Sequence, residues 1–186
     1  NFQYSKVPEF IYFTKKEYLK EKNLIYSKIK KKFKKKEVII RSSSLSEDNQ
    51  YQSSAGKYKS FLNIAIEKKI LFNKIKEVIK DFKNPNDQVI VQKYEKNILL
   101  SGVIFTRDPN SNAPYYIINF DKSGRTDLVT SGKYNPSSRT IVIYKKSKKM
   151  PNIFYNLIKV VKKIEEVFNS KRLDIEFAIE KKTKKI

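Results

Sequence analysis

The chain has 186 residues, 39% of them hydrophobic and 13% aromatic, and a formal net charge of +22. This composition suits a folded protein of one domain or two small lobes. Cysteine and histidine are both absent, which excludes disulfides, thiolate metal sites and histidine as a base, metal ligand or phosphoryl carrier. No apolar run approaches the ~20 residues of a membrane-spanning helix and no signal peptide is visible, so the expected setting is cytoplasmic.

The positive charge has two interpretations. A strongly basic domain is typical of a nucleic-acid-binding protein. Here, however, the basic residues are mostly lysines spread along the whole chain among many Ile, Asn and Tyr residues, as an A/T-biased coding sequence also produces. In the densest run, Lys28–Lys36, Ile29 and Phe33 lie four residues apart. This spacing predicts a solvated helix that packs through those two residues.

The first half of the chain predicts alternating strands and helices. A short strand ends with Phe10–Phe13, and Thr14 with Glu17 has the spacing of a capping box that starts a helix. Apolar residues at 3–4 residue spacing predict a second helix, which ends at Asn84-Pro85-Asn86. The predicted elements are a strand to Phe13, a helix to about Lys36, a strand at Val38–Arg41, an extended segment at Lys57–Ile64, and a helix from Ala65 to Phe82.

The second half predicts more strands, with a lobe boundary near Asn84–Gln88. Turn residues at Asp108–Asn112 separate two of these strands. The remaining predicted elements are strands at Gln88–Tyr94, Leu100–Thr106, Tyr115–Phe120 and Arg139–Tyr144, a helix at about Asn152–Phe168 with Ile153, Leu157, Val161, Ile164 and Phe168 in register, and a last strand at Leu173–Glu180. The order of elements predicts a mixed α+β fold.

One stretch, Val38–Leu62, combines features of an anion site. A buried strand leads to Arg41, and a loop rich in serine and ending in Ser54-Ala55-Gly56 follows. Hydroxyl and backbone N–H groups can donate to phosphate oxygens, and a guanidinium makes paired, charge-assisted bonds to them. The alternative is an ordinary polar loop with Arg41 in a surface ion pair, since the Gly/Lys spacing of a Walker motif is missing.

The last strand is the second informative segment. Side chains alternate along a strand, so Leu173, Ile175, Phe177 and Ile179 face one way, and Asp174 and Glu176 face the other. The two carboxylates then lie roughly 7 Å apart, and Mg²⁺ takes one or two carboxylates and completes its shell with phosphate oxygens and water. The alternative is an exposed strand face whose charge is neutralised by lysines.

Two further positions predict specific contacts. Gln92 lies within an apolar strand and needs hydrogen-bond partners if buried, such as an adenine edge or the backbone of a hinge. Gly102, after Ser101, predicts a close approach of a neighbouring backbone, which ordinary sheet packing also explains.

Together these segments resemble the nucleotide-binding domain of phosphoenolpyruvate synthase and pyruvate phosphate dikinase. Val38–Leu62 resembles the arginine-serine-serine segment of that family, Val89–Lys93 its valine-glutamine strand, Ser101–Pro109 its SGV(M/I)FTxDP motif, and Leu173–Ala178 its DIEW/DIEF strand. The resemblance implies an ATP-grasp fold of two α+β lobes with mixed or antiparallel sheets, here residues 1–84 and 85–186. It also implies phosphoryl transfer from Mg²⁺-bound ATP.

The roles of individual residues follow from the resemblance. Arg41 would bind the ATP phosphates, and Gly56 and Ser60 would belong to the loop that closes over them. Gln92, Lys93 and Tyr94 would form the adenine hinge. Glu176, with Asp174, would hold Mg²⁺. Catalysis would then consist of positioning and charge neutralisation.

The chain also departs from the family pattern. Where the family has GLGE, this chain has Asp121–Asp127, and Asp127 is the nearest candidate for the glutamate. This variant is similar to a capsule-biosynthesis branch that phosphorylates the amide of L-glutamine. The family's early glycine-lysine segment, its LQxRP strand and its phosphorylatable histidine are not found, so we expect a part of a larger enzyme, truncated at both ends.

Three functions therefore remain open. The first is the ATP-binding domain of a phosphoenolpyruvate synthase-like phosphotransferase with a histidine or small-molecule acceptor. The second is a direct small-molecule kinase, such as an L-glutamine kinase. The third is a basic nucleic-acid-binding module, whose binding would weaken steeply with salt.

Overall fold

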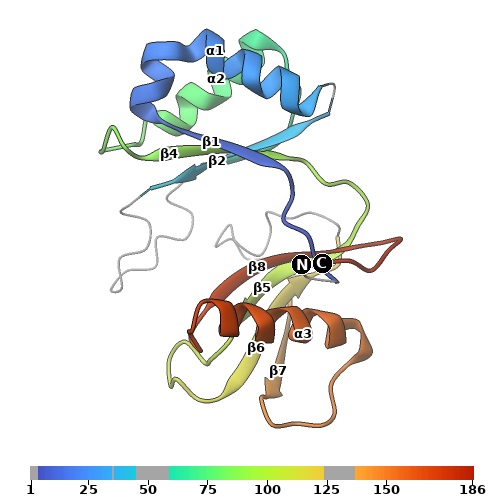
Figure 1. Ribbon diagram of the computed structural model, residues 1–186. Coiled ribbons are helices and arrows are strands. Elements are labelled where there is room, and N and C mark those ends of the chain that lie inside the picture. Colours follow the sequence, from blue (N-terminus) through green and yellow to red (C-terminus); the bar gives the residue numbers. More distant parts are fainter. Residues whose placement is uncertain (1–3, 35, 45–58, 124–136) are drawn as a thin grey trace. The chain divides into compact units, whose positions relative to one another are not determined.

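A computed structural model describes residues 4–34, 36–44, 59–123 and 137–186. The chain divides into two compact units (Figure 1). The first unit is Pro8–Lys96, and the second is Asn97–Ile186 together with Asn1–Val7. Among the described residues, each unit contains one four-stranded antiparallel sheet and at least one helix. The predicted α+β class with two lobes is confirmed.

The first unit is a sheet with two helices on one side (Figure 1). The strands follow the order β1-β4-β2-β3, so β4 lies in the middle of the sheet. The elements are β1 (Phe10–Thr14), α1 (Lys15–Phe33), β2 (Val38–Ser43), β3 (Ser60–Ile64), α2 (Lys68–Ile79) and β4 (Gln88–Lys93).

The position of β4 corrects the predicted division of the chain. We expected the second lobe to begin at residue 85, but β4 pairs with both β1 and β2 of the first unit. Val89 and Val91 are fully buried in the core of that unit. The division therefore falls between Lys96 and Asn97, after the strand that burial and backbone pairing hold in the first sheet.

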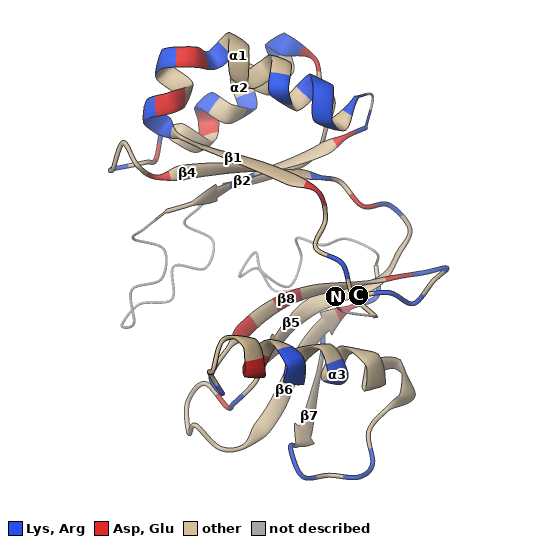
Figure 2. Ribbon diagram, in the orientation of Figure 1, with Lys and Arg blue, Asp and Glu red and all other residues tan. Residues whose placement is uncertain are grey.

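Helix α1 begins as the capping box predicts. The Thr14 side chain accepts a hydrogen bond from the Glu17 backbone N–H (3.1 Å), and the Glu17 carboxylate accepts one from the Thr14 N–H (2.7 Å). These bonds hold the pKa of Glu17 below its usual value. Ile29 and Phe33 are fully buried while the lysines between them are exposed, so the predicted solvated helix face is confirmed. Figure 2 shows the basic residues of α1 in blue.

Helix α2 begins at Lys68, three residues later than predicted. Glu67, directly before it, has extended backbone angles and makes no side-chain capping bond. Ile66 packs against the core from this extended segment. The apolar residue that suggested an earlier helix start therefore lies before the helix.

The second unit has the same kind of layering. Its sheet follows the order β7-β6-β5-β8, and α3 lies across one face (Figure 1). The elements are β5 (Ile98–Phe105), β6 (Tyr115–Asp121), β7 (Arg139–Tyr144), α3 (Asn152–Val167) and β8 (Asp174–Glu180). No helix in the described ranges of either unit is long and apolar enough to cross a membrane.

The buried face of α3 differs from the predicted one. Leu157 and Val161 are buried as expected, but Ile153 and Phe168 are exposed. Phe154 and Ile158 take their place in the core. Phe154 packs edge-on against Phe120 of β6, with ring centroids 5.1 Å apart, so this aromatic contact sets the rotation of the helix.

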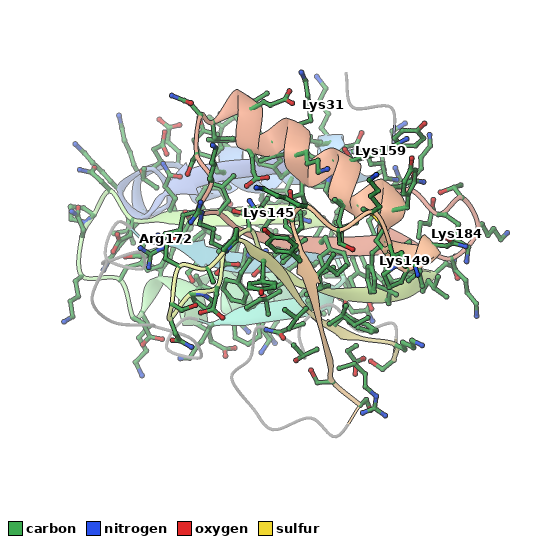
Figure 3. All side chains as sticks on the ribbon, turned by 90° about the horizontal axis from the view of Figure 1, so that it is seen from below. Lys31, Lys145, Lys149, Lys159, Arg172 and Lys184 are labelled. Atoms are coloured by element: carbon green, nitrogen blue, oxygen red, sulfur yellow. The ribbon has the colours of Figure 1, made fainter. Side chains whose placement is uncertain are left out.

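A charged cluster joins α3 to the end of β7. The Lys145 ammonium, labelled in Figure 3, forms an ion pair with Glu165 at 2.5 Å and lies 4.7 Å from the centre of the Tyr116 ring. The Tyr116 hydroxyl donates to the other Glu165 oxygen (3.0 Å). Burial, followed by the Glu165 charge, raises the pKa of Tyr116. Every member of the cluster has a partner, which is what makes buried charge tolerable.

Candidate functional site

In the first unit, three predicted site residues lie on one face of the sheet. Arg41 pairs with Ser60 on one side and with Ile90 on the other. Gln92 lies on the same face, two residues further along β4, because directly paired residues share a face and alternate residues of a strand do too. The opposite face packs on the helices through Val38, Ile40, Val89 and Val91. Within the described ranges no helix covers the face that carries Arg41, Ser60 and Gln92 (Figure 1).

The other residues predicted for this half of the site are placed differently. Lys93 lies on the helix-covered side of β4, opposite Val38, and its ammonium binds both oxygens of Glu95 (2.8 and 2.9 Å). Tyr94 follows the strand, and its backbone N–H donates to the Glu37 carbonyl. Gly56 lies outside the described residues. The structure thus brings together Arg41, Ser60 and Gln92, and leaves Lys93 on the other face.

A buried carboxylate that the sequence did not suggest holds the end of β2. Asp87 is 2% exposed, and one of its oxygens accepts a hydrogen bond from the Ser44 hydroxyl (2.8 Å). Its other oxygen accepts from the Asn84 backbone N–H (3.1 Å), and its backbone carbonyl accepts from Lys15. Asp87 therefore links three segments of the unit where the serine-rich stretch begins.

In the second unit, the predicted carboxylates lie on the face of the sheet opposite α3. Ile175, Phe177 and Ile179 of β8 pack into the core beneath α3. Asp174 and Glu176 are exposed and point the other way. The predicted alternation of β8 is confirmed.

Two more polar residues share this face and were missed. Glu176 pairs with Val103 and Val103 pairs with Asn119, so Asn119 lies about 10 Å from Glu176 across two strand spacings. Asp121, two residues beyond Asn119, is fully buried and accepts a hydrogen bond from the Ser123 N–H (2.7 Å). The alternation of β6, with Tyr116, Ile118 and Phe120 in the core, could have indicated both residues.

Within the Ser101–Pro109 motif, Thr106 is hydrogen-bonded to the residues directly before β8. The buried Thr106 hydroxyl donates to the Lys171 carbonyl (3.0 Å) and accepts from the Leu173 N–H (2.8 Å). The Thr106 backbone N–H donates to the Leu173 carbonyl (2.9 Å). These bonds fix the residues directly before Asp174.

The second half of the motif makes the predicted turn. One Asp108 oxygen accepts from the backbone N–H and the hydroxyl of Ser111 (2.6 and 2.9 Å) and from the Asn110 N–H (3.0 Å). These bonds, those of Ser111 first, lower the pKa of Asp108. Asn112 completes the turn with a φ of 57°, a left-handed conformation that asparagine tolerates.

Replacing Thr106 by valine should loosen the start of β8. The shape of the side chain is kept, but the Leu173 N–H and the Lys171 carbonyl lose their partner, which costs about 1–3 kcal/mol. Hydrogen exchange should show faster exchange at Leu173 and Asp174 while the amides of β2 and β4 are unchanged. Thr106→Ser, which keeps the hydroxyl, is the matched control and should retain most of the protection.

The oxygen donors on this face fit a hard divalent cation. Asp174 and Glu176 are exposed carboxylates on one face, and Mg²⁺ binds through one or two such groups plus phosphate oxygens and water. The described residues hold no cluster of three or more acidic side chains that could bind a metal by themselves. The arrangement therefore fits Mg²⁺ that arrives with a phosphate ligand. Asp127 lies outside the described residues.

Comparison with known proteins finds a family of ATP-binding domains that is similar to the first unit. Residues 15–88 match the family model described as "Pyruvate phosphate dikinase, AMP/ATP-binding domain". The chain is 33% identical over 125 residues to "Uncharacterized phosphotransferase YvkC" of Bacillus subtilis (strain 168). That match covers 59% of this chain and 15% of the relative, so the chain spans only a small part of the relative's length.

A likeness to a solved structure is weak. The macrocyclase MdnC of Microcystis aeruginosa MRC, in complex with its precursor peptide MdnA, superimposes with a TM-score of 0.37 at 11% identity, over 94% of this chain and 44% of that one. A score this low carries no argument about function.

The family match is the finding that describes the chain. Over residues 15–88, which lie within the first unit, the chain is similar to the AMP/ATP-binding domain of pyruvate phosphate dikinase.

Proposed function

We propose that this chain is an ATP-binding part of a phosphotransferase, which holds Mg²⁺-bound ATP for transfer of a phosphoryl group to an acceptor. The observation that carries the proposal is the common face of Arg41, Ser60 and Gln92 in the unit whose sequence matches the AMP/ATP-binding family. A guanidinium and a hydroxyl suit phosphate oxygens, and a side-chain amide suits an adenine edge.

The roles of the groups follow from their chemistry. Arg41 would make charge-assisted bonds to the phosphates, and Ser60 would donate a hydrogen bond to the same groups. Gln92 would bind the base. Asp174 and Glu176 would hold Mg²⁺, which when bound neutralises phosphate charge. The work of the chain is then to position the donor and to balance its charge.

The acceptor is not a histidine of this sequence, because the sequence contains none. The acceptor group, whether a histidine side chain or a small molecule such as the amide of L-glutamine, would therefore be supplied from outside these residues. The size of the B. subtilis relative, of which this chain covers 15%, is consistent with further domains.

Calorimetric titration of the chain with ATP tests the proposal. We expect saturable binding in the presence of Mg²⁺ that weakens at least tenfold when Mg²⁺ is removed with EDTA. A short DNA duplex, titrated at two salt concentrations, tests the rival function, for which affinity falls steeply with salt. Tight salt-dependent DNA binding together with no response to Mg²⁺ and ATP would contradict the proposal and favour a nucleic-acid-binding module.

A further inference from the structure

A groove lies between α1 and α2, on the helix side of the first sheet. Its volume is about 280 Å³, close to the lower limit of small-molecule sites. Four lysines line it: Lys15 and Lys22 of α1, Lys76 of α2, and Lys80 directly after α2. The groove is separate from the face that carries Arg41 and Gln92, because the helices cover the opposite side of that sheet.

Most of these lysines have no carboxylate to neutralise them. The Lys15 ammonium donates to the Phe82 carbonyl (3.0 Å). Among the described residues, no ion pair involves Lys22, Lys76 or Lys80. Like charges four residues apart on a helix repel, as Lys76 and Lys80 do, so an anion in the groove would relieve this repulsion.

The acidic residues of this region are engaged elsewhere. Glu77 pairs with Lys74 (2.8 Å), and Asp81 pairs with Lys59 (3.1 Å). Glu17 belongs to the capping box of α1, and the Glu21 carboxylate, directly before Lys22, lies 4.0 Å from the Lys20 ammonium. The positive charge along the groove is therefore not balanced by the acidic residues next to it in sequence.

The rest of the lining is apolar or aromatic: Tyr18, Leu19 and Ile79. Leu19 is 68% exposed although it is a large aliphatic residue, and Ile79 is buried beside it in the lining. Tyr18 is 2% exposed, and its ring stacks on Phe13 at 5.9 Å. The Tyr18 hydroxyl is itself buried, so Tyr18 contributes packing beneath the groove and no polar contact to it.

We propose that this groove binds a small organic anion, with a phosphate or carboxylate group on a compact apolar or aromatic body. The anionic group binds Lys22, Lys76 and Lys80, and the apolar body covers Leu19 and Ile79. The site is independent of the proposed nucleotide site, so either can fail without the other.

Phenyl phosphate is a suitable probe, because it joins a doubly charged head to an aromatic ring. In an NMR titration of the ¹⁵N-labelled chain at constant ionic strength, we expect saturable shifts of backbone amides in residues 15–22 and 76–80. Inorganic phosphate should bind at least tenfold more weakly, because it offers nothing to the apolar lining. Shifts elsewhere only, or equal affinity for the two probes, would overturn the proposal.

Two double variants that remove the same charge distinguish binding in the groove from general electrostatic attraction of the probe to the chain. Lys22→Gln with Lys76→Gln should weaken binding of phenyl phosphate at least tenfold. Lys30→Gln with Lys69→Gln removes the same charge from exposed positions that do not line the groove, and should change affinity less than twofold. Equal loss in both double variants would mean that phenyl phosphate responds to net charge alone, which overturns the proposal.

Discussion

Arg41→Ala should weaken binding of Mg²⁺-bound ATP by roughly 10- to 150-fold, because a hydrogen bond to a charged group contributes about 1.5–3 kcal/mol. Arg41 lies within β2, with Ile40 and Ser42 buried on either side of it in the strand. Its own side chain lies on the face away from the helices, so truncation should leave the core intact. Calorimetry would give the loss of affinity, and circular dichroism would verify the fold.

Glu176→Gln should act on the same ligand through the metal. The amide keeps the size of the side chain but removes the charge that binds a hard cation. We expect ATP affinity in the presence of Mg²⁺ to fall toward the value measured in EDTA, with little change in EDTA itself. In a longer enzyme that contains this chain, both variants should abolish ATP turnover without unfolding the domain.

Control variants are available for both substitutions. Arg107→Ala removes an exposed guanidinium that donates to the Asn112 carbonyl in the Asp108 turn, and Glu166→Gln removes an exposed carboxylate on α3, paired with Lys163. Neither belongs to the proposed site, so each should leave affinity within about twofold. Unchanged ATP binding in Arg41→Ala and Glu176→Gln, on verified folded protein, would contradict the assignment of the site.

Local features of the fold were predictable because they depend on neighbours in sequence. The capping box of Thr14 and Glu17 and the Asp108 turn involve groups no more than five residues apart. The alternation of β8 likewise follows from the geometry of a single strand. Such patterns correctly placed Asp174 and Glu176 on the exposed face.

Features that depend on pairing between distant strands were not predictable. Gln88–Lys93 looks the same in sequence whether it begins a second lobe or joins the first, and only its pairing with β1 and β2 decides. The link between Ser44 and Asp87 joins residues 43 positions apart. Asn119 belongs to the candidate site only because β6 and β8 flank the same strand, β5.

The direction of the Lys93 side chain was predictable from the sequence. Lys93 follows Gln92 directly in a strand, so the two side chains must face opposite ways. The resemblance grouped Gln92, Lys93 and Tyr94 as one hinge, and alternation alone separates Lys93 from Gln92. In the structure Lys93 is bound to Glu95, which leaves Gln92 as the residue of that strand placed to reach a ligand on the Arg41 face.

Gly102→Ala should destabilise the second unit by at least about 2–3 kcal/mol. A Cβ atom at this position would lie 2.0 Å from the Asn119 carbonyl oxygen and 2.8 Å from the Phe120 Cα. Both atoms belong to the backbone of β6, so no side chain can rotate away. The strands must separate, which weakens the ladder between β5 and β6 and adds overpacking strain to the core.

The opposite substitution in the neighbouring strand provides the control. Ala178→Gly, opposite Ser101 in β8, adds no atom and should cost only roughly 0.5–1 kcal/mol through backbone entropy. Hydrogen exchange can report each unit separately. Gly102→Ala should speed exchange in β5, β6 and β8 far more than Ala178→Gly does, and should leave β2 and β4 unchanged because they belong to the other unit. Equal effects of the two variants would mean that β5 and β6 can move apart at little cost. The close approach at Gly102 would then not stabilise the sheet that carries Asp174 and Glu176.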